Sequence, residues 1–227
     1  MNPKEEKLLQ LAKKRQRKTY EGYSSIGDFN NGAYECDYIS PYSISSHNVD
    51  TKVLVILQDW CSEESFDENV CEETLKYGFT PSVRTNINLQ KLLEEHFHIS
   101  LNEAYATNLF PYIKKGSMSA SIPQKDLVKA AKEFTLPAMQ IIRPTIAICL
   151  GLDTFNAIRI ACGKEDKYPM DKAINSSFEF NGTTIFAQAH TGQMGINNRN
   201  RGGVERVSGD WKKMAEHLQY AYNNRIN

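Results

Sequence analysis

Three side chains with useful chemistry each stand at or near the end of an apolar run. Asp59 follows Gln58 after the first run, Asn108 stands near the end of the second, and His190 follows the fourth. A carboxylate can stabilise positive charge or orient water, an imidazole can donate to a developing negative charge, and an amide offers a donor and an acceptor in one plane. An acid, an amide and an imidazole are thus the first candidates for a functional site.

The apolar runs predict the strands of one sheet. They cover residues 52–57, 104–109, 145–150 and 184–189. Helical patterns lie near residues 86–97, 125–142, 153–162 and 209–224. Pro137 is expected to kink or split the second of these helices. Because strands alternate with helices, the predicted fold class is α/β, a three-layer α/β/α sandwich with a central four-stranded, mainly parallel sheet.

Parallel strands bring their carboxyl ends to one edge of a sheet, where such folds bind ligands. Asp59, Asn108 and His190 are therefore expected to lie close together. The segment after the third strand reads as a turn with Asp153 or Thr154 as the cap of the next helix, and we expect it to be structural.

Composition limits the function classes. The 227 residues, 41% hydrophobic and 24% charged, fit one large domain with at most a small N-terminal appendage. There is neither an apolar run of about 18 residues nor an apolar secretory signal, so we expect a cytoplasmic protein with no membrane partner. The five cysteines form no C-x-x-C pair, which favours free thiols and supports neither a metal nor another cofactor. No obligate protein partner is evident.

The N-terminal part of the chain has a different character from the rest. Residues 1–18 hold seven Lys or Arg against two Glu, although the formal net charge of the whole chain is zero. The sequence predicts a basic amphipathic helix over residues 3–17 and irregular structure over residues 21–50. We therefore expect an N-terminal basic helix and wrap at 1–50 and an α/β domain at 51–227. The helix either adds affinity for a polyanion or packs on the domain.

Four short motifs follow one another along the chain. They are Gln58-Asp59, residues 78–82 with residues 86–89, residues 107–109, and residues 189–194. In this order they resemble the G-Q-D-P-Y loop, the aromatic and Pro-Ser segment, the base-reading asparagine and the H-P-S-P-L loop of the uracil-DNA glycosylase superfamily. The resemblance covers roughly residues 52–218. It implies that family's fold and a monofunctional DNA glycosylase, which flips out a pyrimidine and hydrolyses its N-glycosidic bond.

The resemblance assigns roles that the chemistry also requires. Cleavage of this bond builds positive charge on the sugar and negative charge on the departing base. Asp59 would stabilise the sugar and orient water, and His190 would donate to the base O2. Asn108 would read the Watson–Crick edge of the flipped base. Phe79, or Tyr77, would stack on that base.

The remaining expected contacts line the pocket or touch DNA. Gln58, Trp60 and Cys61 are expected at the substrate. Met194 falls where the family places the apolar wedge that fills the vacated stack. Thr191 and Gly192 can offer backbone N–H groups to phosphate, and the polar stretch with Asn197, Arg199 and Arg201 is expected to lie over the DNA. With Thr191-Gly192 in place of Pro-Ser, the wedge loop is expected to be more flexible.

Each assignment has an ordinary structural alternative. Asp59 could be a helix cap, His190 a structural residue, and Asn108 the residue that holds a turn. Met194 and Trp60 could be core residues. The polar stretch after residue 196 could be a mobile surface loop.

One departure from the family bears on the substrate. The Pro-Tyr after the family's aspartate is Trp60-Cys61 here. That tyrosine is the family's steric guard against a substituent at pyrimidine C5, and cysteine is much smaller. We therefore hypothesise a C5-modified base, such as the hydroxymethylcytosine or glucosyl-hydroxymethylcytosine of phage DNA, and a role in antiviral defence. A Trp60 side chain filling the vacated space would count against this hypothesis.

Three other functions stay open. The first is a conventional uracil-DNA glycosylase of base excision repair. The second is a non-catalytic DNA-binding or inhibitor-binding module of the same fold, against which the presence of both Asp59 and His190 speaks. The third is a hydrolase of free nucleosides or nucleotides, which is weakened by the lack of a G-x-G-x-x-G or Walker loop.

Overall fold

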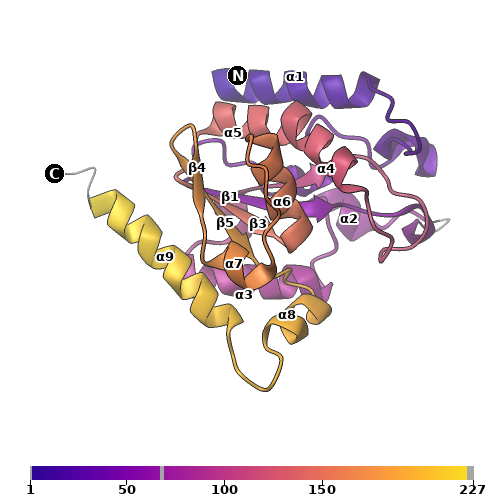
Figure 1. Cartoon of the computed structure of the whole chain (residues 1–227). Coiled ribbons are helices and arrows are strands. Elements are labelled where there is room, and N and C mark those ends of the chain that lie inside the picture. The colour runs from indigo at the N-terminus through magenta and orange to yellow at the C-terminus, as the bar shows by residue number, and fades with distance from the viewer. Residues whose placement is uncertain (1, 67–68, 224–227) are drawn as a thin grey trace.

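A mostly parallel sheet forms the centre of the molecule (Figure 1). In the computed structural model, which describes residues 2–66 and 69–223, the sheet has five strands in the order β2-β1-β3-β5-β4. The strands are β1 (Val53–Asp59), β2 (Tyr105–Phe110), β3 (Ile146–Leu150), β4 (Phe178–Phe180) and β5 (Thr183–Gln188). The α/β class and the four parallel strands agree with the prediction, each strand lying within two residues of its expected bounds.

The fifth strand corrects the predicted count of four. β4 pairs antiparallel with β5 at the edge of the sheet. Its three residues are too few to show an alternating pattern. The turn that joins it to β5 is Asn181-Gly182, and both residues have positive φ, 49° and 82°. Asn-Gly is a strong signal for a two-residue hairpin turn, so the sequence did carry a mark of this hairpin.

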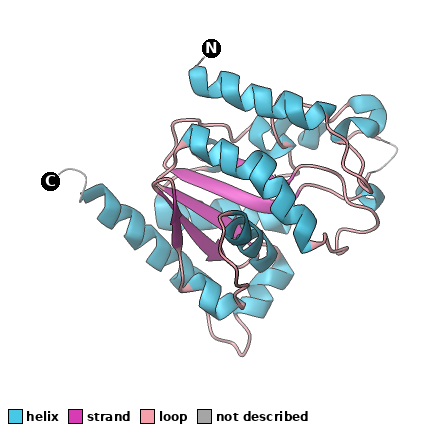
Figure 2. Cartoon of the chain, turned by 45° about the horizontal axis from the view of Figure 1, so that its top comes forward, coloured by secondary structure: helices cyan, strands magenta, loops and turns pink. Residues whose placement is uncertain are grey.

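Helices cover both faces of the sheet, which gives three layers (Figure 2). The α-helices among the described residues are α1 (Pro3–Arg17), α2 (Glu72–Tyr77), α3 (Arg84–Phe97), α4 (Gln124–Ala130), α5 (Leu136–Ile142), α6 (Leu152–Ala161), α7 (Met170–Ile174), α8 (Gln193–Arg199) and α9 (Val207–Asn223). Helices α4 to α6 lie on one face, with α1 outside α5, and α3 and α9 lie on the other (Figure 1). Residues 224–227 of the expected second domain are outside the described residues.

Strand β1 explains the apolar run that first marked the sheet. Leu54 and Ile56 pack into the core on the α6 side, whereas Val53, Val55 and Leu57 pack into the core on the α3 side. All five are nearly or fully buried. A strand with helices on both faces has no solvent side, so its sequence is continuously apolar.

The long helical pattern near residues 125–142 is split, as Pro137 predicted. A single π turn, Ala131–Thr135, separates α4 from α5. Pro137 then occupies the first turn of α5, directly after the π turn.

The basic helix α1 packs on the rest of the chain, one of its two predicted roles. Three of its cations and the adjoining Lys18 meet carboxylates of other segments: Lys4–Asp50 2.9 Å, Lys13–Asp37 2.5 Å, Arg15–Glu35 2.6 Å and Lys18–Glu133 2.5 Å. Leu8 of this helix shares the core beneath α5 and α6. A hollow of about 740 Å³ along its surface is lined by basic, polar and apolar side chains, among them three lysines and Arg17, and holds no histidine. No helix in the described part of the chain has the length and apolar character to cross a membrane.

Candidate active site

A cavity of about 450 Å³ opens at the carboxyl end of β1. Asp59 and His190 both line it, as the convergence of strand ends predicts. The remaining walls come from the segment after β1, from the start of α3 and from the N-terminal wrap, which contributes Tyr34 and Tyr42. The two tyrosines were not expected at the site, because nothing in a Tyr-, Ser- and Asn-rich segment indicates which ring will face a cavity.

Asp59 is held from two sides. Its Oδ2 atom lies 2.9 Å from Nζ of Lys114, and its Oδ1 atom accepts a hydrogen bond of 3.1 Å from Nε2 of Gln58. The side chains of Asp59 and Lys114 are only 8% and 5% exposed. Gln58 does not itself line the cavity; it orients the carboxylate. A carboxylate has about four acceptor positions, so room is left for a water molecule.

Lys114 was missed in the sequence. It follows β2 within a Lys-Lys pair, a pattern typical of surface, and only its position after a strand end pointed to the site. Besides Asp59, its Nζ donates to the carbonyl of Met118 at 2.6 Å. Its backbone is fixed too, since its carbonyl accepts from the N–H group of Glu63 at 2.9 Å.

His190 follows β5 and is held as a neutral side chain. Its Nδ1 atom accepts the backbone N–H of Gly192 at 3.0 Å, so the ring proton is assigned to Nε2. Burial lowers the pKa of His190; Asp59 raises this pKa and Lys114 lowers it. The net direction is down, so the imidazole is mainly uncharged at neutral pH.

The glycines after His190 are needed for space. A Cβ atom on Gly192 would lie 2.9 Å from His190 Nδ1, and one on Gly195 would lie 2.1 Å from the His190 carbonyl oxygen. Gly192 has φ −65°, which any residue adopts. The structure therefore gives Gly192 a packing role in place of the expected flexibility.

Thr191 fastens the same loop to the start of α3. Its hydroxyl donates to the carbonyl of Thr85 at 3.0 Å, and its own carbonyl accepts from Nδ2 of Asn88 at 2.8 Å. The side chain is almost fully buried. The Thr191 hydroxyl is thus occupied within the protein, and any phosphate contact would fall to backbone groups.

Two asparagines lie under and beside the cavity. Asn108 is fully buried within β2 and does not line it; its Oδ1 accepts from the Ser40 hydroxyl, and its Nδ2 has no partner among the described residues. It pairs in register with Leu57, a lining residue. Asn86 of α3 lines the cavity directly, between the Tyr42 hydroxyl and the Thr80 carbonyl. Sequence reasoning placed Asn86 in a motif but gave it no role.

Aromatic rings form the walls. Phe79 stacks on Tyr42 with ring centroids 4.8 Å apart. Trp60 lies edge-on to Tyr34 and donates from Nε1 to the Gly78 carbonyl at 2.8 Å. This hydrogen bond fixes the indole at the edge of the cavity.

Cys61 lines the same cavity as Trp60. Both side chains therefore contact the same cavity. Burial raises the pKa of the Cys61 thiol.

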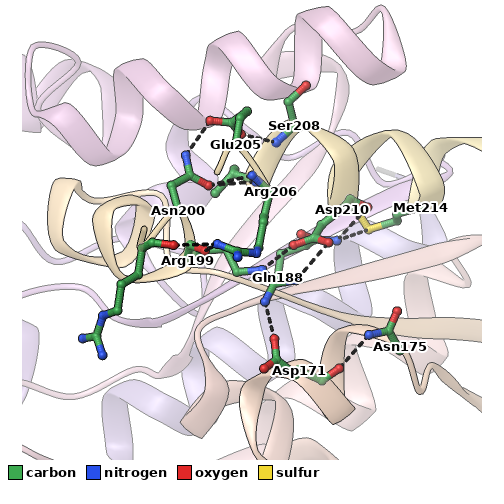
Figure 3. Close-up of polar contacts among 12 residues, drawn as sticks. Asp171, Asn175, Gln188, Arg199, Asn200, Glu205, Arg206, Ser208, Asp210 and Met214 are labelled. Carbon is green, nitrogen blue, oxygen red and sulfur yellow. Dashed lines mark hydrogen bonds and ion pairs between the residues drawn. The ribbon is translucent and has the colours of Figure 1, made fainter. Parts of the chain in front are cut away.

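Helix α8 presents Met194 to solvent, with 79% of the residue exposed. Asn197 and Arg201 are also exposed. Arg199 differs, as Figure 3 shows: its guanidinium lies between Asp210, 2.6 Å away, and Asp171. These contacts raise the pKa of Arg199 and tie α8 to α9 and α7. Its positive charge is compensated internally, so we assign Arg199 to anchoring α8 rather than to DNA.

The loop between α8 and α9 is braced by further contacts of this cluster. Asn200 accepts from the backbone N–H groups of Arg206 and Val207 at 2.9 and 3.1 Å, and its amide donates to Glu205 at 2.5 Å (Figure 3). The Arg206 guanidinium donates to the carbonyl of Arg201 at 2.8 Å. The polar stretch is therefore shaped by its own side chains.

In the described part of the chain, no group of three or more His, Cys, Asp or Glu residues is placed to hold a metal ion. All five cysteines are free thiols. No protein-family model and no curated protein matches the chain. The function is therefore inferred from the geometry of the cavity.

Proposed function

We propose that this chain is a DNA glycosylase. It would draw one pyrimidine nucleotide out of the DNA stack into the cavity and hydrolyse its N-glycosidic bond. The observation that carries the proposal is the placement of the Asp59 carboxylate and the His190 imidazole in one aromatic-walled cavity at the carboxyl edge of the sheet. The uracil-DNA glycosylase-like fold is part of the same proposal, and the parallel order β2-β1-β3-β5 supports it.

Asp59 acts on the sugar. Lys114 and Gln58 hold both carboxylate oxygens, so the group is oriented before DNA arrives. Its remaining lone pairs face the positive charge that develops at C1′ and accept a hydrogen bond from the attacking water. A preorganised carboxylate needs no reorientation during the reaction, which is the main source of electrostatic catalysis.

His190 acts on the departing base. The Gly192 N–H group occupies Nδ1, so Nε2 is left as a donor to the base O2, where negative charge develops. A proton on Nδ1 would place the donors of His190 and of the Gly192 N–H group face to face, which disfavours the charged imidazolium. The lowered pKa of His190 agrees with this. A neutral, fixed donor then stabilises the leaving anion.

The size of the cavity favours a substrate base larger than uracil. By the sequence resemblance, Cys61 would take the position of the tyrosine guard of the uracil-DNA glycosylases, and the volume of about 450 Å³ lies within the range of whole ligand pockets, ~300–1,000 Å³. Pyrimidines with a hydroxymethyl or glucosyl-hydroxymethyl group at C5 are the substrates we favour. Their occurrence in phage DNA would make the activity a defence against phage.

Base release from defined DNA tests this function. Duplex and single-stranded oligonucleotides would carry uracil, thymine opposite guanine, 5-hydroxymethylcytosine or glucosylated 5-hydroxymethylcytosine. Free base would be measured by mass spectrometry, with Asp59→Asn and His190→Ala as inactive comparisons. Release of the bulky cytosines alone supports the proposal, and release of uracil alone makes the chain a conventional repair enzyme.

Two results would replace the proposal. DNA binding without release of any base would indicate a non-catalytic module. Cleavage of free nucleosides at a higher rate than of DNA would indicate a nucleoside hydrolase.

The matched control for the loss of the Asp59 carboxylate is Asp153→Asn, on the exposed start of α6.

A further inference from the structure

A primary amine is buried beside the proposed catalytic carboxylate, and base hydrolysis does not use it as a nucleophile. The Nζ atom of Lys114 lies 2.9 Å from Asp59, and its side chain is 5% exposed. Of its two hydrogen-bond partners, one is Asp59 and the other is the carbonyl of Met118, a cavity-lining residue. Lys114 itself does not line the cavity, and its amine lies one hydrogen bond behind the group proposed to contact C1′.

We propose that Lys114 gives this chain a second activity, an abasic-site lyase, in which its amine attacks C1′ after the base has left and the strand is then cut. The inference rests on the proposed function, because that function brings the sugar of a flipped nucleotide to Asp59. It goes beyond the single hydrolytic step that the sequence resemblance implies.

The reaction balances without any oxidant, reductant or cofactor. The abasic sugar opens to an aldehyde at C1′. Nζ passes a proton to Asp59 and forms a C–N bond to C1′, and Asp59 returns that proton to the carbinolamine hydroxyl, which leaves as water to give a protonated imine. The Asp59 carboxylate then accepts a proton from C2′, the C3′–O bond breaks, and the 3′-phosphate departs as the 5′-phosphate of the downstream strand. Water hydrolyses the imine, which restores the amine and leaves an unsaturated aldehyde on the upstream strand.

Burial suits this role. A lysine nucleophile must lose its proton, and removal from water disfavours the charged form of an amine, which is why lysines that form imines are commonly buried. The 2.9 Å contact with Asp59 provides an acceptor for that proton. Lys115, next in the chain, is exposed and shows neither feature. The paired lysines of α1 lie on the helix that packs outside α5.

Borohydride trapping tests the inference independently of base release. The protein would be mixed with a duplex that carries one preformed abasic site, in the presence of sodium borohydride, which reduces an imine to a stable cross-link. Wild-type protein is expected to give the cross-link and, without borohydride, a nicked strand. Lys114→Arg keeps a cation beside Asp59 but cannot form the imine, so both products should be lost. Lys115→Arg is the matched control and should keep them.

Peptide mapping protects the test against a misfolded variant. Mass spectrometry of the wild-type cross-link should place the reduced sugar on Lys114. Absence of any cross-link with wild-type protein, or a cross-link mapped to another amine, overturns the inference. A Lys114 cross-link on abasic DNA together with no base release from any substrate would support the lyase and reject the proposed glycosylase, so the two failures are distinguishable.

Discussion

At the scale of single residues, the charge state of His190 depends on an opposing pair. Asp59 favours the imidazolium form and Lys114 disfavours it, while burial sets the overall direction. Burial has the largest effect on the His190 pKa, the effect of Asp59 is second and that of Lys114 third. Burial and Lys114 together thus allow a carboxylate and a neutral imidazole to share one cavity.

Asp59→Asn is expected to lower the pKa of His190 further. The substitution removes the charge that raises this pKa and leaves Lys114, which lowers it. An NMR titration of the His190 ring in both proteins measures the effect directly, with the exposed His98 as an internal reference. A His190 pKa that rises in Asp59→Asn would contradict the assigned electrostatics.

The two asparagines should respond differently to substitution. Asn86→Ala removes an amide that lines the cavity, so kcat/KM for base release should fall. It also leaves the buried Tyr42 hydroxyl without its acceptor, so the free energy of unfolding should fall by about 1–3 kcal/mol as well. Asn108→Ala leaves the buried Ser40 hydroxyl without its acceptor, so the free energy of unfolding should fall by about 1–3 kcal/mol. Urea unfolding and single-turnover kinetics on both variants separate the roles. Loss of base release in Asn108→Ala at unchanged stability would return the base-reading role to Asn108.

At the scale of elements, the sequence located the parallel strands well because each is buried on both faces. The continuous apolar run of β1 and the strand-end position of Asp59 both followed from that burial. Short elements, and residues whose role depends on tertiary contacts, could not be predicted in the same way. β4 has three residues, and Lys114 acquires its role only where the segment after β2 meets the end of β1. Likewise, Tyr34 and Tyr42 reach the cavity through tertiary packing that no local pattern encodes.

The anchoring of α8 by Arg199 gives a prediction at this scale. Arg199→Ala would leave the nearly buried Asp210 unpaired, and breaking a buried ion pair costs about 3–5 kcal/mol. Asp171→Ala removes a carboxylate whose side chain is 87% exposed and should cost less than about 1 kcal/mol. Thermal or urea unfolding compares the two variants. Equal losses would mean that Asp210 does not hold the helix.

At the scale of the whole molecule, net charge gives no general attraction to DNA. The formal net charge of the chain is zero. Several cations of α1 and the adjoining Lys18, which form the most basic segment, are paired with carboxylates of the same protein. If the chain acts on DNA as we propose, its affinity must come from the local surface around the cavity and α8. Exposed Met194, on a helix fixed by Arg199, is the feature of this surface that best suits insertion into a base stack.

Met194→Ala should weaken base release from duplex DNA but not from single strands. Only a duplex leaves a vacated stack for the side chain to fill, and unstacking costs a few kcal/mol, so a loss of about tenfold or more is expected. Val204→Ala, at another exposed apolar residue, is the matched control. Equal losses on both DNA forms would assign Met194 to general binding.

The most direct test of the central claim is the release of glucosylated 5-hydroxymethylcytosine from a duplex oligonucleotide, followed by mass spectrometry under single-turnover conditions. Wild-type protein is expected to release the free modified base. Asp59→Asn and His190→Ala should lose this release, and Asp153→Asn should keep it. Bound DNA with every modified and unmodified base still attached would contradict the central claim.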